Sequence, residues 1–411
     1  MQHVTAVGLG VVVFSLLGSP TANASNDDDS SDNESSAQSN IFVSNRDSTM
    51  SLVRCKVRGS EDDDSSDDGR HAGMPGEVGI LCKEVQNAAV GFKTSWPANQ
   101  YPGEEDDWWW TGLSGEVIGL KAEKNVKALL KDKNRKVVDT YTYAGVAPGL
   151  PTAGSNFIGV SPKDKTAWNS AREIDEIQEI DIDPDSRTFG QILTHITVPL
   201  SPDASAGSST KGKMRPCDMS ITPDGKYLWE PDIGGETLTG VDIHNKQVIA
   251  QITLPREDAA NRVIPFMLTT NGKLALIENF EAPFGTESIV DVSDPANPVH
   301  LKKLTQADGL GITPETSEFT PDGKYAYIIT NGSPSIPGEI NVLDLSTLQI
   351  SKSIALPDGC RPHTGDFTND GGYFVVNCSG ANTVAVISNE LQEVVQNVAL
   401  SGVTPRGVIT R

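Results

Sequence analysis

The sequence predicts an all-β protein: a seven-bladed β-propeller of four-stranded antiparallel blades, closed by pairing of its N- and C-terminal segments. Three observations lead to this prediction: a repeat, a strand pattern within each repeat, and two incomplete ends. The turn glycines Gly225, Gly272, Gly323 and Gly371 are 47, 51 and 48 residues apart. Each repeat holds four short runs with the two-residue alternation of strands, separated by turn signals. Four strands in about 48 residues are typical of one propeller blade.

Four clear repeats occupy the C-terminal half of the chain, at 217–255, 263–304, 315–357 and 363–400. Residues 157–199 fit the same template as a further blade. Residues 88–145 fit it less well, and the strands expected there are 108–111, 116–122 and 136–143. The stretch 121–132 has a helical pattern and is interpreted as an insertion.

The two ends of the chain predict how the ring closes. Residues 40–45 (NIFVSN) match the second strand of a repeat with no first strand before it. Residues 404–411 (TPRGVITR) match a first strand with nothing after it. Because an open sheet edge invites pairing with other chains, we expect the C-terminal strand to complete the N-terminal blade. The propeller is then expected to span 40–411, with about 53 residues in each of seven blades.

The repeats also carry a family resemblance. Residues 223–228 (PDGKYL) and 321–332 (PDGKYAYIITNG) resemble the YVTN β-propeller repeat, and the resemblance extends over 214–411. It implies a secreted or periplasmic protein similar in fold to lactonase-like propellers, the haem d1 propeller of nitrite reductase and the methylamine dehydrogenase heavy chain. It implies little about activity, because one fold hosts many functions.

The N-terminal segment predicts export to the periplasm or the extracellular space. Residues 4–17 form an apolar run of signal-peptide length and a small-x-small pattern ends at Ala24, so 1–24 is expected to be a signal peptide. Residues 25–39 are rich in Ser and Asp and are expected to form a disordered acidic leader. A second acidic stretch, 60–75, is expected to be a loop within the closing blade. We expect no transmembrane span.

The charge balance limits the class of partner. The chain has 55 acidic and 33 basic residues, a formal net charge of −22. Such a chain repels phosphate backbones, so nucleic acid is not an expected partner. We expect a monomer that binds a protein or a small anionic ligand.

The five cysteines predict two disulfides. Cys55 ends the third strand of the closing blade and Cys82 lies in its fourth, while Cys360 enters the first strand of the last blade and Cys378 leaves the second. Adjacent antiparallel strands bring such positions within bonding reach. We therefore predict Cys55–Cys82 and Cys360–Cys378, with Cys217 free.

Candidate site residues gather at one face of the predicted ring, called the mouth below, where the loops entering first strands and leaving second strands meet. They are Arg215, Cys217, Glu230, Glu278, Glu315, Arg361, His363 and Arg406. Arginines grip carboxylate or phosphate with two hydrogen bonds, and Glu230 and Glu315 are candidate ligands of a divalent cation. A structural interpretation stays open: asparagines such as Asn331 and Asn377 cap turns, and the recurrent x-Pro-x reflects backbone geometry.

The leading functional hypothesis is a non-catalytic propeller that binds a partner protein or a small anionic ligand at the mouth. No self-contained catalytic motif is present, and a rigid ring with variable loops suits recognition. Two alternatives stay open. One is a lactonase-like hydrolase in which mouth carboxylates hold a metal ion that activates water. The other is a cofactor-less propeller subunit of a periplasmic oxidoreductase.

Overall fold

The computed structural model describes residues 38–47, 49–57, 79–89, 100–102, 108–113, 116–131, 137–145, 150–151, 158–161, 163–183, 185–201 and 212–410. All of them belong to one unit, Ser36–Arg411. Between residues 88 and 151 only the backbone is described. The predicted signal peptide and the acidic loop 60–75 lie outside the described residues.

The described strands form seven antiparallel sheets, called blades 1 to 7 below. Blade 1 comprises, from the channel outward, β29 (Pro405–Thr410), β1 (Gln38–Asn45), β2 (Thr49–Val57) and β3 (Ile80–Ala89). Blade 2 comprises β4 (Gln100–Pro102), β5 (Trp108–Leu113), β6 (Glu116–Lys131), β7 (Val137–Gly145) and β8 (Leu150–Pro151). Blade 3 comprises β9 (Ile158–Val160), β10 (Thr166–Ala171), β11 (Glu176–Asp181) and β12 (Ile192–Thr197).

The other four blades follow the repeats found in the sequence. Blade 4 comprises β13 (Ser220–Ile221), β14 (Tyr227–Asp232), β15 (Thr237–Asp242) and β16 (Gln247–Thr253). Blade 5 comprises β17 (Pro265–Thr270), β18 (Leu274–Asn279), β19 (Thr286–Asp291) and β20 (Val299–Leu304). Blade 6, preceded by the 3-10 helix η1 (Gln306–Asp308), comprises β21 (Pro314–Phe319), β22 (Tyr325–Thr330), β23 (Glu339–Asp344) and β24 (Gln349–Ala355). Blade 7 comprises β25 (Gly365–Phe367), β26 (Tyr373–Cys378), β27 (Thr383–Ser388) and β28 (Glu393–Ala399).

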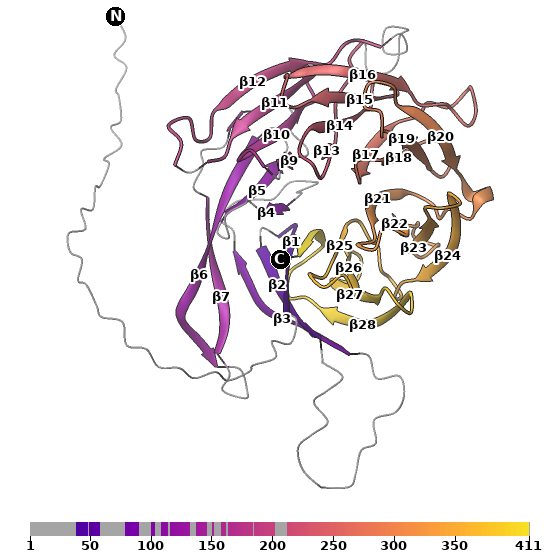
Figure 1. The fold of residues 1–411 in the computed structure, drawn as a ribbon. Helices are drawn as coiled ribbons and strands as arrows, with labels where there is room; N and C mark the ends of the chain where they lie inside the picture. Colours follow the sequence, from indigo (N-terminus) through magenta and orange to yellow (C-terminus); the bar gives the residue numbers. More distant parts are fainter. Residues whose placement is uncertain are drawn as a thin grey trace, which may run out of the picture. The chain divides into compact units, whose positions relative to one another are not determined.

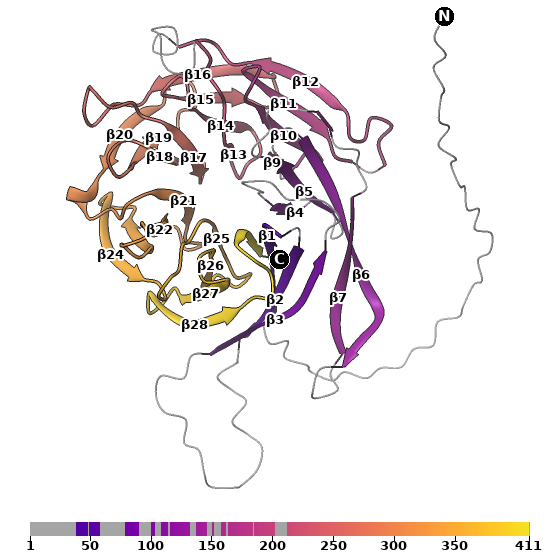
Figure 2. The same ribbon diagram turned by 180° about the vertical axis from the view of Figure 1, so that it is seen from behind.

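The innermost strands close a ring. Going round from blade 1, each contacts the innermost strand of the next blade: β29, β4, β9, β13, β17, β21 and β25, which returns to β29. Figures 1 and 2 show the blades around a common centre, with the yellow β28 beside the indigo strands of blade 1. No helix in the described part of the chain is long and apolar enough to span a membrane.

The predicted closure is confirmed. β29 pairs with β1 in antiparallel register, with Phe42 opposite Ile409 and Val43 opposite Val408. β1 begins at Gln38, inside the segment predicted as the acidic leader. The C-terminal segment therefore supplies the innermost strand of the blade whose other three strands come from the start of the propeller.

Blade 2 departs from the prediction in two ways. Lys121–Lys131, which has a helical pattern, is strand in the structure and belongs to β6. Backbone pairing with β7 overrides the local helical preference. The blade also has a fifth strand, because β8 pairs with β6, whereas four-stranded blades were expected throughout.

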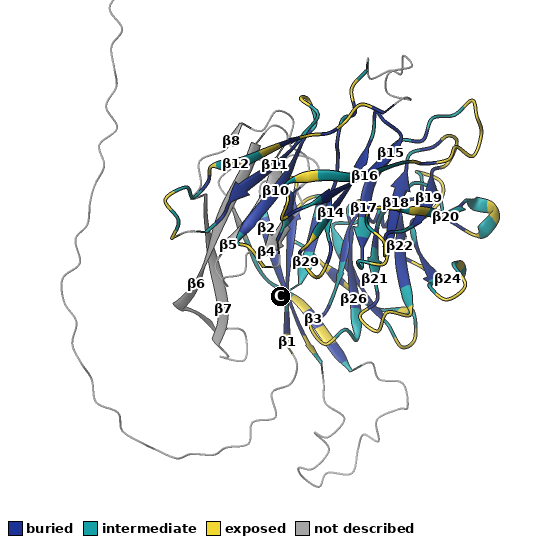
Figure 3. Cartoon of the chain, turned by 45° about the horizontal axis from the view of Figure 1, so that its top comes forward, coloured by how far each residue is buried: buried dark blue, intermediate teal, exposed yellow. Residues whose placement is uncertain are grey.

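Burial explains why these sequences form blades. The second strands β14 and β22 are buried at every position after the first, because blades pack against both of their faces. The outer strands β20 and β24 alternate between exposed and more buried positions. Figure 3 shows the same contrast between inner strands and outer turns. Trp168, Trp229 and Tyr327 are fully buried between blades and are the largest fully buried side chains of the described core.

Both predicted disulfides are present. Cys55 bonds Cys82 across β2 and β3, and Cys360 bonds Cys378. Cys360 lies in the loop that enters β25, so the second bridge ties this loop to the end of β26. Cys217 takes no part in either disulfide, as predicted, and is buried.

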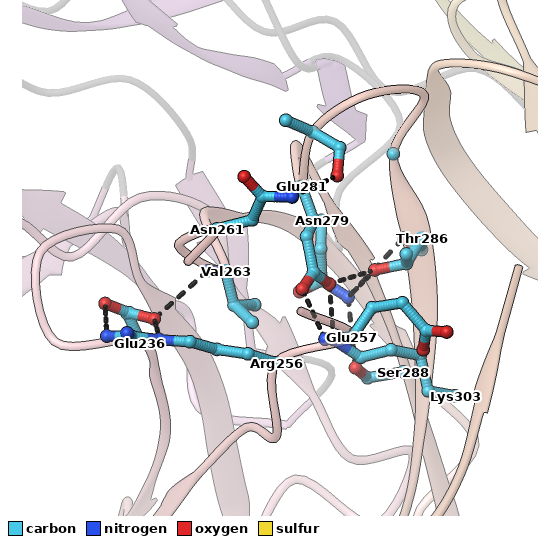
Figure 4. A network of polar contacts seen from close by, with 12 residues as sticks. Glu236, Arg256, Glu257, Asn261, Val263, Asn279, Glu281, Thr286, Ser288 and Lys303 are labelled. Atoms are coloured by element: carbon cyan, nitrogen blue, oxygen red, sulfur yellow. Dashed lines mark hydrogen bonds and ion pairs between the residues drawn. The ribbon is translucent and has the colours of Figure 1, made fainter. Parts of the chain in front are cut away.

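A polar network fixes the loop that joins blades 4 and 5 on the mouth side (Figure 4). Glu236 accepts hydrogen bonds from Arg256 (2.8 Å), Arg262 (2.6 Å) and the backbone N–H of Val263 (3.0 Å). Burial tends to raise the pKa of Glu236, but the bonds from the two arginines outweigh it and lower the pKa. Glu281, in the next blade, accepts from Lys303 and holds the same loop from the other side.

Candidate functional site

Three of the entrances to first strands share one backbone geometry. Arg215, Thr313 and Thr404 each precede a proline and take φ of 58°, 58° and 55°. The following prolines, at 216, 314 and 405, lie opposite the ends of the second strands. A proline by itself favours extended backbone with negative φ in the residue before it, so the left-handed turn is a property of these entrances and not of the x-Pro pair alone. The three x-Pro-x segments thus share one backbone geometry.

Two asparagines at the mouth connect one blade to the next. Asn331 donates to the carbonyl oxygen of Pro362 at 2.7 Å, and Asn377 to that of Pro405 at 2.6 Å. Asn377 also accepts from the backbone N–H groups of His363 and Thr364. The prediction that these side chains cap turns of their own strand was wrong, because their donor atoms reach the following blade.

Replacing Asn377 with Ala is expected to lower the free energy of unfolding by about 2 kcal/mol, because it leaves three buried backbone groups without partners. Urea denaturation measures the change. Asn297→Ala is the matched control, since Asn297 is exposed and bonds only within its own turn. A loss at Asn377 no larger than the loss at Asn297 contradicts the linking role.

Side chains from three blades, most of them basic, lie close together at the mouth. Glu315 begins β21, Arg361 and His363 precede β25, Arg406 lies on β29, and Arg46 follows β1. Nε2 of His363 lies 3.4 Å from Oε2 of Glu315, and Nε of Arg361 donates to Oδ1 of Asn331 at 2.8 Å. Glu315, Arg361, His363, Arg406 and Arg46 are called the arginine cluster below.

The charges within the arginine cluster perturb one another. Burial lowers the pKa of His363 to about 3, helped by the positive charges of Arg406 and Arg46, so its imidazole is neutral at pH 7. The contact with Glu315 is therefore not an ion pair. Burial raises the pKa of Glu315 to about 7 although Arg406 and Arg361 oppose it. The pKa of Arg406 falls to about 10 because of burial and the charge of Arg46, with Glu315 opposing.

A second group lies on the far side of the mouth, in blades 3 and 4. Nη2 of Arg172 lies 2.8 Å from Sγ of Cys217. Glu230 is 0% exposed, and burial together with nearby Asp232 raises its pKa well above the usual value. Arg215 faces away, toward the exposed Glu173 at 3.7 Å. This group combines a buried thiol with buried carboxyl groups whose pKa values are raised.

Glu278 belongs to neither group. It lies on β18 directly opposite Glu287 on β19, and both side chains are 0% exposed. Burial and the neighbouring carboxyl raise the pKa of Glu278 well above its usual range. This carboxyl pair is part of the interface between blades 5 and 6, where Ser317 donates to Glu287.

The proposed metal ligands Glu230 and Glu315 lie on different blades, at β14 and β21. In the described ranges, no group of three or more His, Cys, Asp or Glu side chains has the geometry to hold a metal ion. The cation site stays a prediction. The sequence reasoning also missed Asp218, Glu318 and Asp366, which line the channel below the mouth. Each of them lies two or four residues after an entrance proline. Because side chains alternate along a strand, this even spacing predicts that all three face the channel.

Solved structures share this architecture. A Bacteroides fragilis protein assigned as a 6-phosphogluconolactonase aligns with a TM-score of 0.61 and 13% identity, over 94% of this chain and 100% of that chain. The Pseudomonas aeruginosa periplasmic gluconolactonase gives 0.58 and 12%, over 91% and 99%. A dihydro-haem d1 dehydrogenase gives 0.50 and 15%, over 90% and 65%. The fold is a β-propeller. Identities this low establish the fold alone, and neither a protein-family model nor a curated protein matches the chain.

Proposed function

We propose that this chain is an exported β-propeller that binds a small anionic ligand, a carboxylate or a phosphate, at the arginine cluster. One observation carries the proposal. Arg361 is fixed by Asn331, and among the described side chains no carboxylate lies within ion-pair distance of it. A half-buried guanidinium held in one orientation presents its remaining N–H groups to a planar anion.

The electrostatics of the cluster support an anion rather than a cation. The pKa of Arg406 is lowered by burial and by the charges of Arg46 and Arg361, which exceed the opposing effect of Glu315. An anion between these guanidinium groups relieves their mutual repulsion. Because the site is partly buried, the attraction is screened less than on an open surface.

Export is part of the proposal. Disulfides persist in oxidising compartments, and this chain has two. The predicted signal peptide at 1–24 provides the route. The Pseudomonas aeruginosa relative in fold is itself described as periplasmic.

Isothermal titration with malonate and with inorganic phosphate tests the proposal. We expect one anion site per chain. The variant Arg361→Ala should bind the anion about 10- to 100-fold more weakly, because it loses one charge-assisted hydrogen-bonded pair. Arg187→Ala is the control, since Arg187 is exposed in the turn between β11 and β12. The proposal is overturned if the two variants bind with equal affinity. It is also overturned if neither anion saturates the protein at 10 mM, about a 10-fold excess over a weak 1 mM Kd.

Lactone hydrolysis is the second candidate. It is favoured by the neutral imidazole of His363 beside Glu315, and by the two lactonase-named relatives in fold. His363 is 0% exposed, however, so a substrate cannot touch it without rearrangement, and we rank binding first. Hydrolysis of gluconolactone that His363→Asn abolishes favours the enzyme. Activity that EDTA also removes favours the metal-assisted form.

A further inference from the structure

A cavity lies inside the channel, below the arginine cluster. Its volume is about 300 Å³, and the first strands of blades 1 and 3 to 7 line it. Three carboxylates face it from three blades: Asp218 beside β13, Glu318 on β21 and Asp366 on β25. Among the described lining residues there is no Lys, Arg or His. The cavity therefore collects acidic groups without a basic side chain from the described strands.

These carboxylates differ in how firmly they are held. Asp366 accepts from the backbone N–H groups of Phe367 and Thr410, both at 2.7 Å, so its two oxygens are fixed. Asp218 is 3% exposed; one oxygen accepts from Leu268 and the other, Oδ1, has no hydrogen-bond partner among the described residues. Such a buried polar atom costs free energy unless a ligand or a proton satisfies it.

Glu318 is the carboxylate most dependent on a cation. No side chain or backbone group in the described ranges bonds to it. Burial raises its pKa well above the usual value, and Asp366, Glu278 and Asp218 raise it further. The three charged groups that raise it are thus all acidic.

The arrangement of the carboxylates favours an extended organic cation over a metal ion. The carboxylates stand on separate blades, and the described residues offer no three metal donors that converge, so a bare metal ion is not favoured. Between them the wall is mixed, with Ser220, Thr269 and Thr364 beside the apolar Met219, Met267 and Leu268. An extended molecule with charges at its ends and methylene groups between them matches this arrangement.

We propose that the channel cavity binds a linear aliphatic diamine, whose two ammonium groups pair with carboxylates on different blades while its methylene chain spans the space between them. Each ammonium supplies three donors, which suits the free oxygen of Asp218 and the unbonded carboxylate of Glu318. This site is separate from the arginine cluster and does not depend on the anion proposed there.

Isothermal titration of the full chain with 1,4-diaminobutane, butylamine and 1,4-butanediol tests the proposal. We expect one diamine per chain, at least about tenfold weaker binding of the monoamine, and no binding of the diol, because two charge-assisted pairs become one or none. Glu318→Gln is expected to weaken diamine binding about tenfold or more. Glu393→Gln is the control, since Glu393 is exposed at the start of β28.

The outcomes separate this site from the other one. Arg361→Ala should retain diamine binding, and Glu318→Gln should retain anion binding. Thermal unfolding establishes that each variant folds, and Asp366→Asn replaces Glu318→Gln if that variant does not. Equal affinity of Glu318→Gln and Glu393→Gln, equal binding of the monoamine and the diamine, or no binding of the diamine overturns the proposal. Tighter binding of Mn²⁺ than of the diamine overturns it in favour of a metal.

Discussion

A chain lacking residues 404–411 is expected to lose cooperative unfolding altogether, because β29 is the innermost strand of blade 1 and has no substitute. Val408 is 9% exposed and packs with Ile41 and Val43. Without β29 the inner edge of β1 is open, and blade 7 loses the hydrogen bonds of Thr364 and Asp366 to this strand. We expect the free energy lost with these contacts to exceed the free energy of unfolding of a domain, about 5–15 kcal/mol.

Circular dichroism during urea denaturation measures this. A chain lacking only Arg411 is the control and should unfold as the full chain does. Val408→Ala is the milder variant, expected to cost about 2 kcal/mol by leaving a cavity in the same interface. A truncated chain with a sharp transition at the midpoint of the full chain contradicts the closure of the ring.

Stability is expected to fall as the pH rises from about 4 to about 7. Burial raises the pKa of Asp218 and of Asp232 to about 7, and that of Asp366 to about 6, from 3.8. Between these values the folded protein keeps protons that the unfolded chain releases, so each unit of pH costs about 1.4 kcal/mol per group. The contribution is fully present below pH 4 and lost above pH 7. His363 and His300, whose pKa values burial lowers, act in the opposite direction but are only two groups.

Glu278→Gln isolates one part of this effect. The amide keeps the shape of the protonated carboxyl and cannot ionise, so the variant should gain stability relative to the parent as the pH rises above about 5. Urea denaturation at pH 5, 6, 7 and 8 gives the slope of the free energy of unfolding against pH for the parent and for Glu278→Gln. The control Glu393→Gln should have the same slope as the parent. A parent whose free energy of unfolding is constant or rises between pH 5 and 7 contradicts the account.

The sequence predicted the ring well because its signals are local. Turn chemistry at Gly225 and its counterparts, period-two runs and the two incomplete ends each depend on a few neighbouring residues. The disulfides followed from strand adjacency. The stretch 121–131 was misinterpreted because its composition favours a helix, while pairing with β7 makes it strand.

The site was predicted less well because burial depends on neighbouring blades. Arg361 and Arg215 occupy related entrances in the sequence, yet Asn331 of the preceding blade holds the first and the exposed Glu173 attracts the second. Glu278 was predicted at the mouth as a ligand, but it faces Glu287 in an interface. Contacts of this kind join residues in different repeats, and the pattern within one repeat does not encode them.

A crystal grown in selenate measures the central claim most directly, because the anomalous scattering of selenium locates the anion without prior assumptions. The account predicts a selenate within hydrogen-bond distance of the guanidinium groups of Arg361 and Arg406. Selenate found only elsewhere on the propeller, with these two arginines bonded to protein groups alone, contradicts it.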